Sequence, residues 1–484
     1  MTGATGARTQ TLNKNNTMVQ QIKFGTDGWR AVIGDDFTFA NLEKVGLATA
    51  RYFKGHKKIK NGIVIGYDAR FMSREFAEKS AEVVANTGIK VKISDSIATT
   101  PMISLLTKLE NAAGGVVITA SHNPPKWNGF KIKGDFGGPA HPEMIARVEK
   151  ELARVMKLKK IPLGKHTFGQ LVDKGKISLI GMKQRYLDDL STKINLDLIR
   201  RSGIRIVYDP MYGAGQGVLD NVLTGVKQIH EEYNPSFGGT NPEPLEHNLT
   251  ELSGAVKSGG FHIGIATDGD ADRIGAVDEN GAFVDSHRIF CLLLKYMVEQ
   301  KGMTGEVVKS FSVTQMVDKM CSKYGLTMHE TAIGFKHICR MMTERDVLIG
   351  GEESGGLGVK GHIPERDGIF LGLMLCEIMA TRQTTLSVLV TELMSEFGQH
   401  EFKRVDLHVS EKEKAAIMKI YQKGVGEIAG FPVTGRKDTD GHKFFVPSGW
   451  VLVRASGTEP LIRFYAEAEN VAKVDALLAA ATRL

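Results

Sequence analysis

Short apolar runs alternate with helical patterns along most of this chain. Residues 62–67 form an apolar run that leads into a polar loop, and residues 73–87 follow with apolar positions at helical spacing. A glycine and a second apolar run over residues 89–93 complete the unit. Strand, loop, helix, glycine and strand in this order are typical of βαβ units on largely parallel sheets.

The same order of elements begins twice more along the chain. A strand that starts at Ile204 leads into a loop with three glycines, and we expect a helix after this loop. A strand that starts at Val307 precedes a predicted helix over residues 313–324 and a predicted strand over residues 326–329. Three related α/β domains in tandem are therefore predicted.

The pattern changes at about residue 402. Strand-like runs and helical patterns alternate there, which is typical of a small α+β domain with an antiparallel sheet. The predicted elements are strands over residues 404–409, 450–454 and 462–466 and helices over residues 411–423 and 470–484.

The predicted fold class is α/β, with three tandem related domains on mostly parallel mixed sheets plus a C-terminal α+β domain. A chain of 484 residues is too long for one hydrophobic core, which supports several domains. We expect a disordered N-terminal extension and four domains, with these bounds: 1–20 for the extension, 21–165 for domain 1, 166–282 for domain 2, 283–396 for domain 3 and 397–484 for domain 4.

Composition narrows the class of protein further. The hydrophobic share of 42% and the charged share of 24% are ordinary for a soluble protein. The net charge of +7 is spread along the chain rather than gathered in a basic stripe with aromatic residues, so we expect no nucleic-acid partner. No apolar run is long enough to span a bilayer, so no membrane partner is expected. Four cysteines without a CxxC pair indicate buried thiols and a cytoplasmic enzyme.

The first string with chemical potential is Thr119-Ala-Ser-His-Asn-Pro-Pro, which follows an apolar run. Its small residues are expected to expose Ser121 beside His122, and its two prolines stiffen the loop. A lone loop serine usually only caps a turn. A rigidly held, exposed hydroxyl next to a histidine is nevertheless what a covalent phosphoryl carrier needs. We therefore predict Ser121 as the nucleophile and His122 as a donor to its phosphate.

Three aspartates alternate in the string Thr267-Asp-Gly-Asp-Ala-Asp-Arg between two apolar runs. In an extended loop Asp268, Asp270 and Asp272 point to one side, where their charges repel unless a cation neutralises them. We predict a Mg²⁺ site there, with open positions for phosphate oxygens. An EF-hand is excluded because Arg273 stands where that loop requires glycine. A solvated acidic turn is the alternative.

Two further loops offer groups that suit a sugar phosphate. In Gly350-Gly-Glu-Glu-Ser-Gly-Gly, glycines free the backbone while the carboxylates and the hydroxyl can bind sugar hydroxyls. In Arg454-Ala-Ser-Gly-Thr-Glu-Pro, with Arg463 after it, arginines and hydroxyls follow a strand and can form a phosphate cradle. Each string by itself is also compatible with a structural turn.

Taken in order, the four strings resemble those of the α-D-phosphohexomutase family, the phosphoglucomutases and phosphomannomutases. The resemblance runs from about residue 22 to the C-terminus and includes the strings Phe24-Gly-Thr-Asp-Gly-Trp-Arg, Gly66-Tyr-Asp-Ala-Arg and Asn128-Gly-Phe-Lys. It implies four domains around one central cleft, each with one loop, and an intramolecular phosphotransferase that acts on hexose phosphates. Domain 4 is expected to rotate and close the cleft, because water would otherwise hydrolyse the phosphoserine.

The resemblance also implies the chemistry. Phospho-Ser121 donates its phosphoryl group to give a hexose 1,6-bisphosphate, which turns over in the cleft, returns the other phosphate and serves as an activator. Mg²⁺ is held by Ser121 and the three aspartates. Lys131 is assigned as proton shuttle with Arg30, which requires a lowered lysine pKa, and a purely electrostatic Lys131 is the alternative. The predicted substrate-binding residues are Arg273, Gly334, Lys336, Glu352, Ser354, Arg454, Ser456, Gly457, Thr458 and Arg463.

Substrate choice is less constrained by these strings. The Glu-Glu-Ser string resembles phosphoglucomutases more than dual-specificity relatives, and Gly356 stands where those relatives have a histidine. Glucose phosphate is therefore the preferred substrate, and mannose phosphate presents the same O3 and O4 hydroxyls. A phosphoglucosamine or phosphopentose mutase is one alternative, and an inactive sugar-phosphate-binding relative is another. A monomer or a weak homo-oligomer is expected.

Overall fold

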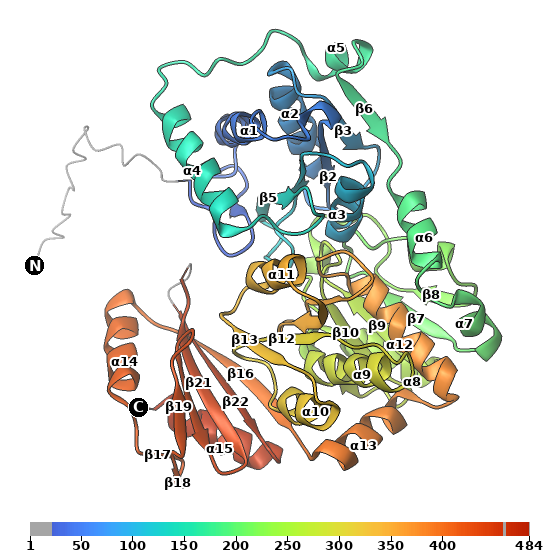
Figure 1. Ribbon diagram of the computed structural model, residues 1–484, viewed down its shortest axis with the longest axis vertical. Helices are drawn as coiled ribbons and strands as arrows, with labels where there is room; N and C mark the ends of the chain where they lie inside the picture. Colours follow the sequence, from blue (N-terminus) through green and yellow to red (C-terminus); the bar gives the residue numbers. More distant parts are fainter. Residues whose placement is uncertain (1–21, 458–460, 484) are drawn as a thin grey trace, which may run out of the picture.

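The computed structural model describes residues 22–457 and 461–483. The predicted N-terminal extension and Thr458 lie outside these residues. Four units, each with its own main sheet, follow one another along the chain and appear from blue to red in Figure 1. This arrangement confirms the predicted α/β class with a distinct C-terminal domain.

The first unit is built on a six-stranded sheet with the strand order β1-β5-β4-β2-β3-β6. Strands β4, β2, β3 and β6 are parallel, and β5 and β1 are added antiparallel at one edge. The elements are β1 (Trp29–Val32), α1 (Phe39–Phe53), η1 (Ile59–Asn61), β2 (Ile63–Tyr67), α2 (Ser73–Asn86), β3 (Val91–Ser94), α3 (Thr100–Leu109), β4 (Gly114–Ile118), β5 (Trp127–Gly134), α4 (Pro142–Met156), α5 (Phe168–Asp173) and β6 (Ile177–Ile180).

The predicted boundary after residue 165 is wrong. It assigns β6 to domain 2, whereas β6 pairs in parallel with β3 and so completes the sheet of domain 1. The segment from α4 to α5 carries the chain across to this far edge, as Figure 1 shows at the top of the molecule. Such a return depends on a pairing between distant segments, and the local pattern does not encode it.

The second unit has a five-stranded sheet with the order β11-β10-β9-β7-β8, in which only β8, β7 and β9 are parallel. The helix expected after its glycine loop is absent from this described segment, where a single 3-10 turn, η2, takes its place. Glycines at 213, 215 and 217 make a helix costly there. The elements are α6 (Lys183–Ser191), α7 (Leu196–Ser202), β7 (Ile206–Asp209), η2 (Leu219–Asn221), β8 (Val226–Gln228), η3 (Phe237–Gly239), η4 (Glu246–Asn248), α8 (Thr250–Gly259), β9 (Ile263–Thr267), β10 (Ile274–Asp278) and β11 (Phe283–Val284).

The third unit has a four-stranded sheet with the order β13-β12-β14-β15, parallel except for β15. Its helix α10 begins at Met316, three residues later than predicted, because residues 311–315 form a turn. The elements are α9 (Ser286–Glu299), β12 (Glu306–Ser310), α10 (Met316–Tyr324), β13 (Met328–Thr331), α11 (Phe335–Glu344), β14 (Val347–Gly351), β15 (Leu357–Val359), α12 (Gly368–Arg382) and α13 (Leu386–Phe397).

The C-terminal unit has the predicted antiparallel sheet, with the order β16-β22-β21-β20-β19. Helix α14 has the predicted bounds because Ser410 and Glu413 form a capping box at its start. The elements are β16 (Glu401–His408), α14 (Glu411–Lys423), β17 (Glu427–Ile428), β18 (Phe431–Pro432), β19 (Gly435–Lys437), β20 (His442–Val446), β21 (Gly449–Ala455), β22 (Leu461–Ala468) and α15 (Val471–Ala481).

Domains 2 and 3 share one large hydrophobic core, which also includes residues of β2, α3 and β4 of domain 1. Helix α12 packs on β9 and β10 of domain 2 and is buried along nearly its whole length. The four cysteines are buried free thiols, as the sequence indicates. Among the described helices, none by itself is long and apolar enough to cross a membrane. Helices α12 and α13, which are bent by 84° relative to each other, reach the length and composition of a membrane span only when taken together.

Candidate active site

Ser121 lies in a tight turn directly after β4. Its backbone φ is +53°, and its N–H donates to Thr119 Oγ1 at 2.8 Å. The hydroxyl donates to Asp268 Oδ2 at 2.6 Å and lies 3.3 Å from His122 Nδ1. Burial and nearby arginines hold the pKa of His122 well below its ordinary value, so this ring is neutral and carries one N–H.

The expectation that the Ser121 hydroxyl is exposed is wrong. Ser121 is only 1% exposed because the metal loop of domain 2 packs over it. Gly269 approaches so closely that a Cβ there would lie 2.4 Å from the Ser121 carbonyl oxygen. The serine is therefore enclosed between two domains, and a glycine is required at the point of contact.

Arg70 holds the serine loop in shape and was not predicted as a site residue. Its guanidinium is fully buried and donates to four backbone carbonyl oxygens of the loop, and its Nε lies 3.2 Å from Asp68 Oδ2. The four acceptors are the carbonyl oxygens of Ser121, Asn123, Pro124 and Trp127. The signal was present in the string Gly66-Tyr-Asp-Ala-Arg, where two opposite charges directly follow a buried strand.

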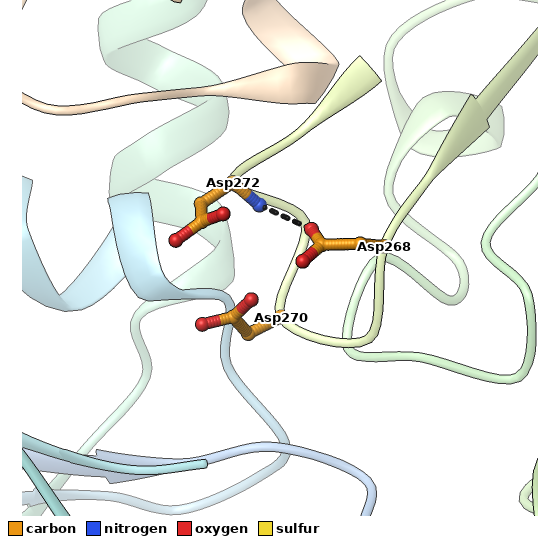
Figure 2. Close-up of side chains that lie close together, drawn as sticks. All are labelled: Asp268, Asp270 and Asp272. Atoms are coloured by element: carbon orange, nitrogen blue, oxygen red, sulfur yellow. Dashed lines mark hydrogen bonds between the residues drawn. The ribbon is translucent and has the colours of Figure 1, made fainter. Parts of the chain in front are cut away.

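The three aspartates converge, as predicted, although their loop is a turn rather than an extended segment. Ala271 adopts a φ of +58°, and its N–H donates to the Asp268 carbonyl at 2.9 Å. One carboxylate oxygen from each aspartate lies within 4.8 Å of the others, and all three residues are buried. Figure 2 shows the three carboxylates facing one another, with Asp268 Oδ1 accepting from the Asp272 N–H at 2.9 Å.

This cluster fits a divalent cation. Asp270 Oδ1 and Asp272 Oδ1 are buried and have no hydrogen-bond partner among the described residues. Burial and the two neighbouring carboxylates raise the pKa of Asp268 well above its ordinary value, which a cation would reverse. Thr100 Oγ1 donates to Asp270 Oδ2 at 2.5 Å and so orients this ligand from domain 1. Hard carboxylate oxygens suit Mg²⁺.

Two basic side chains border the acidic cluster. Lys131 Nζ lies 2.8 Å from Asp270 Oδ2 and 2.9 Å from Asp27 Oδ2. Arg366, which sequence reasoning missed, lies 2.6 Å from Asp272 Oδ2 and 2.7 Å from Asp27 Oδ2. Asp27 was also missed, although it stands inside the string Phe24-Gly-Thr-Asp-Gly-Trp-Arg. The carboxylate of Asp27 thus lies between two cations, Lys131 and Arg366, beside the three aspartates.

The pKa of Lys131 differs from the expectation. Burial by itself lowers this pKa, but Asp27, Asp270 and Asp272 raise it overall above its ordinary value. A proton shuttle was expected to need a lowered pKa. The raised pKa instead strongly favours the ammonium form of Lys131. The other predicted shuttle, Arg30, donates to Asn123 Oδ1 at 2.5 Å and thus borders the serine loop.

The loop that contains Glu352 and Ser354, which we call the sugar loop, follows β14. Glu352 is buried, and its Oε1 accepts from the N–H of Gly334 at 2.7 Å, which brings two predicted substrate-binding residues together. Burial raises the pKa of Glu352 to about 7. Gly356 leaves room for Arg366, because a Cβ there would lie 2.3 Å from Arg366 Cδ. A side chain at this position would therefore displace Arg366.

The other predicted contacts lie in domains 2, 3 and 4. Arg273 pairs with Glu243 at 2.8 Å, Lys336 lies in the first turn of α11, and Ser354 is half-buried beside Glu352. In domain 4, Arg454 at the end of β21 lies 2.9 Å from Asp440 and stands opposite Arg463 in the sheet register. The remaining predicted residues of this loop are Ser456, which is buried, and Gly457, which is exposed.

Comparison with known proteins agrees with this architecture. Four domain families, described as phosphoglucomutase/phosphomannomutase domains I, II and III (alpha/beta/alpha) and the C-terminal domain, match residues 21–159, 184–281, 285–397 and 405–484. A phosphoglucomutase/phosphomannomutase of Thermococcus kodakarensis is 31% identical, over 93% of this chain and 95% of that protein. A phosphoglucosamine mutase of Natranaerobius thermophilus is 30% identical, over 92% of this chain and 95% of that protein.

A solved structure agrees as well. A protein of Thermus thermophilus, provisionally assigned as a phosphomannomutase, superposes with a TM-score of 0.82 at 32% identity, over 96% of this chain and 98% of that protein. The matches to all four domains, in order and over nearly the full length, leave one assignment. The chain belongs to the phosphoglucomutase/phosphomannomutase family, the α-D-phosphohexomutases, and is an intramolecular phosphotransferase.

Proposed function

We propose that this enzyme interconverts hexose 1-phosphate and hexose 6-phosphate through phospho-Ser121 and a hexose 1,6-bisphosphate, which also acts as activator. The supporting observation is the 2.6 Å hydrogen bond from the Ser121 hydroxyl to Asp268, which joins the serine loop of domain 1 to the acidic cluster of domain 2. A phosphate on Ser121 would lie beside this cluster. Phosphoryl transfer needs such alignment and charge neutralisation more than covalent help from the protein.

The chain's own residues divide the work. Asp268, Asp270 and Asp272 would hold Mg²⁺, which when bound neutralises charge on the transferring phosphoryl oxygens. Arg70 holds the Ser121 loop in place through the Ser121 carbonyl oxygen. Gly269, which has no side chain, lets the loop of domain 2 pack closely over Ser121. In each transfer one O–P bond forms while another breaks, so a proton must leave the attacking hydroxyl and reach the leaving oxygen.

Proton transfer and substrate orientation fall to the surrounding loops. We retain Lys131 and Arg30 as the proposed proton shuttle; a cation bound to Asp270 and Asp272 would offset the carboxylate charges that raise the pKa of Lys131. Glu352 and Ser354, with Gly334 and Lys336, would orient the sugar through its O3 and O4 hydroxyls. The non-reacting phosphate would bind at the domain 4 loop, through the residues Arg454, Ser456, Gly457, Thr458 and Arg463. Arg273 of domain 2 would help to offset the charge of phospho-Ser121.

We propose glucose phosphate as the preferred substrate, with mannose phosphate also accepted. The Glu352-Glu353-Ser354 string supports this choice, as does Gly356, which gives its space to Arg366. Phosphoglucosamine is the second candidate, because a relative of that name is 30% identical over nearly the whole chain. We further propose that the enzyme works in the cytoplasm as a monomer or a weak homo-oligomer.

Mass spectrometry and a substrate panel test this function together. The purified enzyme should carry a phosphate on Ser121, and Ser121→Ala should lower turnover at least about 1,000-fold, as expected when a covalent nucleophile is removed. Ser96→Ala, at an exposed serine of the same domain, is the control and should leave activity unchanged. Near-normal activity of Ser121→Ala would overturn the mechanism.

The panel should contain glucose, mannose, glucosamine and ribose phosphates, each assayed with Mg²⁺ and with a chelator. The highest kcat/KM is expected for glucose phosphate, and only when Mg²⁺ is present. A preference for glucosamine phosphate would replace the proposed substrate while leaving the mechanism in place. No turnover of any sugar phosphate would favour the inactive binding relative.

A further inference from the structure

One face of the domain 4 sheet carries a row of charged side chains across three strands. Cross-strand partners in an antiparallel sheet point to the same face. Arg454 on β21 stands opposite Arg463 on β22, and Arg463 stands opposite Asp406 on β16. Arg404, two residues before Asp406, lies on the same face and stands opposite Tyr465. The face therefore presents Arg404, Asp406, Arg463 and Arg454, a set we call the arginine row.

Asp406 holds two of these arginines at once. Its Oδ1 lies 3.0 Å from Arg404 Nε, and its Oδ2 lies 3.6 Å from Arg463 Nε. Asp440 in turn lies 2.9 Å from Arg454 Nε. Among the described residues, Asp406 and Asp440 thus pair with the three guanidinium groups of the row. Like charges directly opposite one another in a sheet are unfavourable, and an anion between them removes the penalty.

Arg404 lies on the face of the domain 4 sheet that packs against domain 3, because its cross-strand partner Tyr465 belongs to a hydrophobic cluster with Phe311. Burial by itself lowers its pKa, but Asp406, Glu243 of domain 2 and Glu353 of the sugar loop raise it overall. Burial likewise lowers the pKa of Arg454, whereas Asp440 and, after it, Glu353 raise this pKa overall. The carboxylate of Glu353 therefore interacts electrostatically with both Arg404 and Arg454, although these arginines stand on different strands. Lys403, the neighbour of Arg404, points to the opposite face and pairs with Asp475 of α15 at 2.7 Å.

We propose that Arg404 is a third substrate-binding arginine of domain 4, which contacts the phosphate group together with Arg454 and Arg463, and that Asp406 is a positioning residue for Arg404 and Arg463. A phosphate dianion offers several acceptor oxygens, and planar guanidinium groups bind such oxygens in pairs. The proposal rests on the proposed function, because it requires a sugar phosphate in the cleft.

The test compares Arg404→Gln with Lys403→Gln, which removes a positive charge one residue away on the opposite face. Calorimetric titration with glucose 1-phosphate should give a Kd that is roughly 10-fold to 100-fold higher for Arg404→Gln, as expected for one charge-assisted contact. KM should rise in parallel while kcat changes little, because the contact is the same in the ground state and the transition state. Lys403→Gln should match the wild type.

Further variants keep the proposal falsifiable. Arg404→Lys retains the charge without the planar fork and should fall between the wild type and Arg404→Gln; it serves as the test if Arg404→Gln does not fold. Asp406→Asn should raise KM without a matching loss of kcat. A Kd for Arg404→Gln within about 2-fold of Lys403→Gln would overturn the proposal, since a lost charged contact exceeds this change.

Arg404 could instead bind Glu353 when domain 4 closes. In that case Glu353→Gln would weaken binding as much as Arg404→Gln, and the double variant would lose nothing more. This result would also overturn the proposal. Failure of the proposed function is recognised separately, because the wild-type enzyme would then convert none of the sugar phosphates in the panel.

Discussion

At Ser121 the backbone lies in the left-handed region, with a φ of +53°. Residues other than glycine rarely adopt this conformation, and it persists only where the surroundings enforce it. Here Thr119 accepts the Ser121 N–H and Arg70 binds the Ser121 carbonyl oxygen. The turn aims the hydroxyl at Asp268 instead of along the strand. Local strain and interdomain contact together therefore determine where the hydroxyl of Ser121, the proposed nucleophile, points.

Glu352 gives a pH-dependent prediction at the residue scale. Its pKa is raised by burial from 4.5 to about 7, so the folded state keeps a proton that the unfolded chain has lost between these values. The folded state binds more protons in this window, and the free energy of unfolding therefore falls as the pH rises. The fall attributable to Glu352 is about 3 kcal/mol between pH 4.5 and pH 7.

Urea denaturation at several pH values measures this effect. Glu352→Gln should remove the fall, because the amide does not titrate, while Glu344→Gln, at an exposed glutamate of the same domain, should retain it. Equal pH dependence in the wild type and Glu352→Gln would contradict the prediction.

At the scale of elements, the active site follows from neighbouring parallel strands. Strands β2 and β4 pair in parallel, so the loops after Tyr67 and Ile118 meet at one edge of the sheet. Arg70 comes from the first loop and Ser121 from the second. The sheet thus brings a basic clamp and a nucleophile together although fifty-one positions separate them in the chain.

Arg70→Lys tests the clamp. Lysine keeps the charge but cannot reach four carbonyl oxygens at once, so buried acceptors lose their donors. We expect the free energy of unfolding to fall by about 3 kcal/mol and kcat to fall with it. Arg74→Lys, at an exposed arginine in the first turn of α2, is the matched control. A stability and a kcat equal to those of this control would show that the clamp is dispensable.

At the scale of the whole molecule, one short segment of domain 3 joins three domains. Glu365 Oε2 lies 2.6 Å from Lys133 Nζ of domain 1, and Arg366 reaches Asp272 of domain 2. Asp367 accepts from Tyr186 at the start of domain 2 at 2.7 Å. All of these groups are buried, so the segment links domains 1 to 3 around the acidic cluster.

Glu365→Gln tests this link, because it leaves Lys133 buried without an anion. Breaking a buried pair from one side costs about 3–5 kcal/mol, and the melting temperature should fall accordingly. Glu143→Gln breaks the pair of Glu143 with Arg340, which joins the same two domains at the surface, and should leave stability nearly unchanged. Equal melting temperatures for the two variants would refute the structural role of the segment.

The sequence by itself determined the features that depend on near neighbours. Apolar periodicity revealed the strand–helix units, the capping box set the start of α14, and the serine and aspartate strings marked the reacting loops. These signals are local, since turns, caps and periods are decided within a few residues. The family resemblance likewise came from short strings, each of which spans only a few neighbouring residues.

Only the tertiary structure decided the features that join distant segments. The place of β6 in the first sheet, the burial of Ser121, the raised pKa of Lys131 and the approach of Arg366 all depend on packing between domains. Burial and electrostatic interactions act through space, so the partners of a charged side chain cannot be assigned from its neighbours in the chain. The types of residue in the candidate site could therefore be recognised from the sequence, whereas their relative positions and their protonation states depend on the fold.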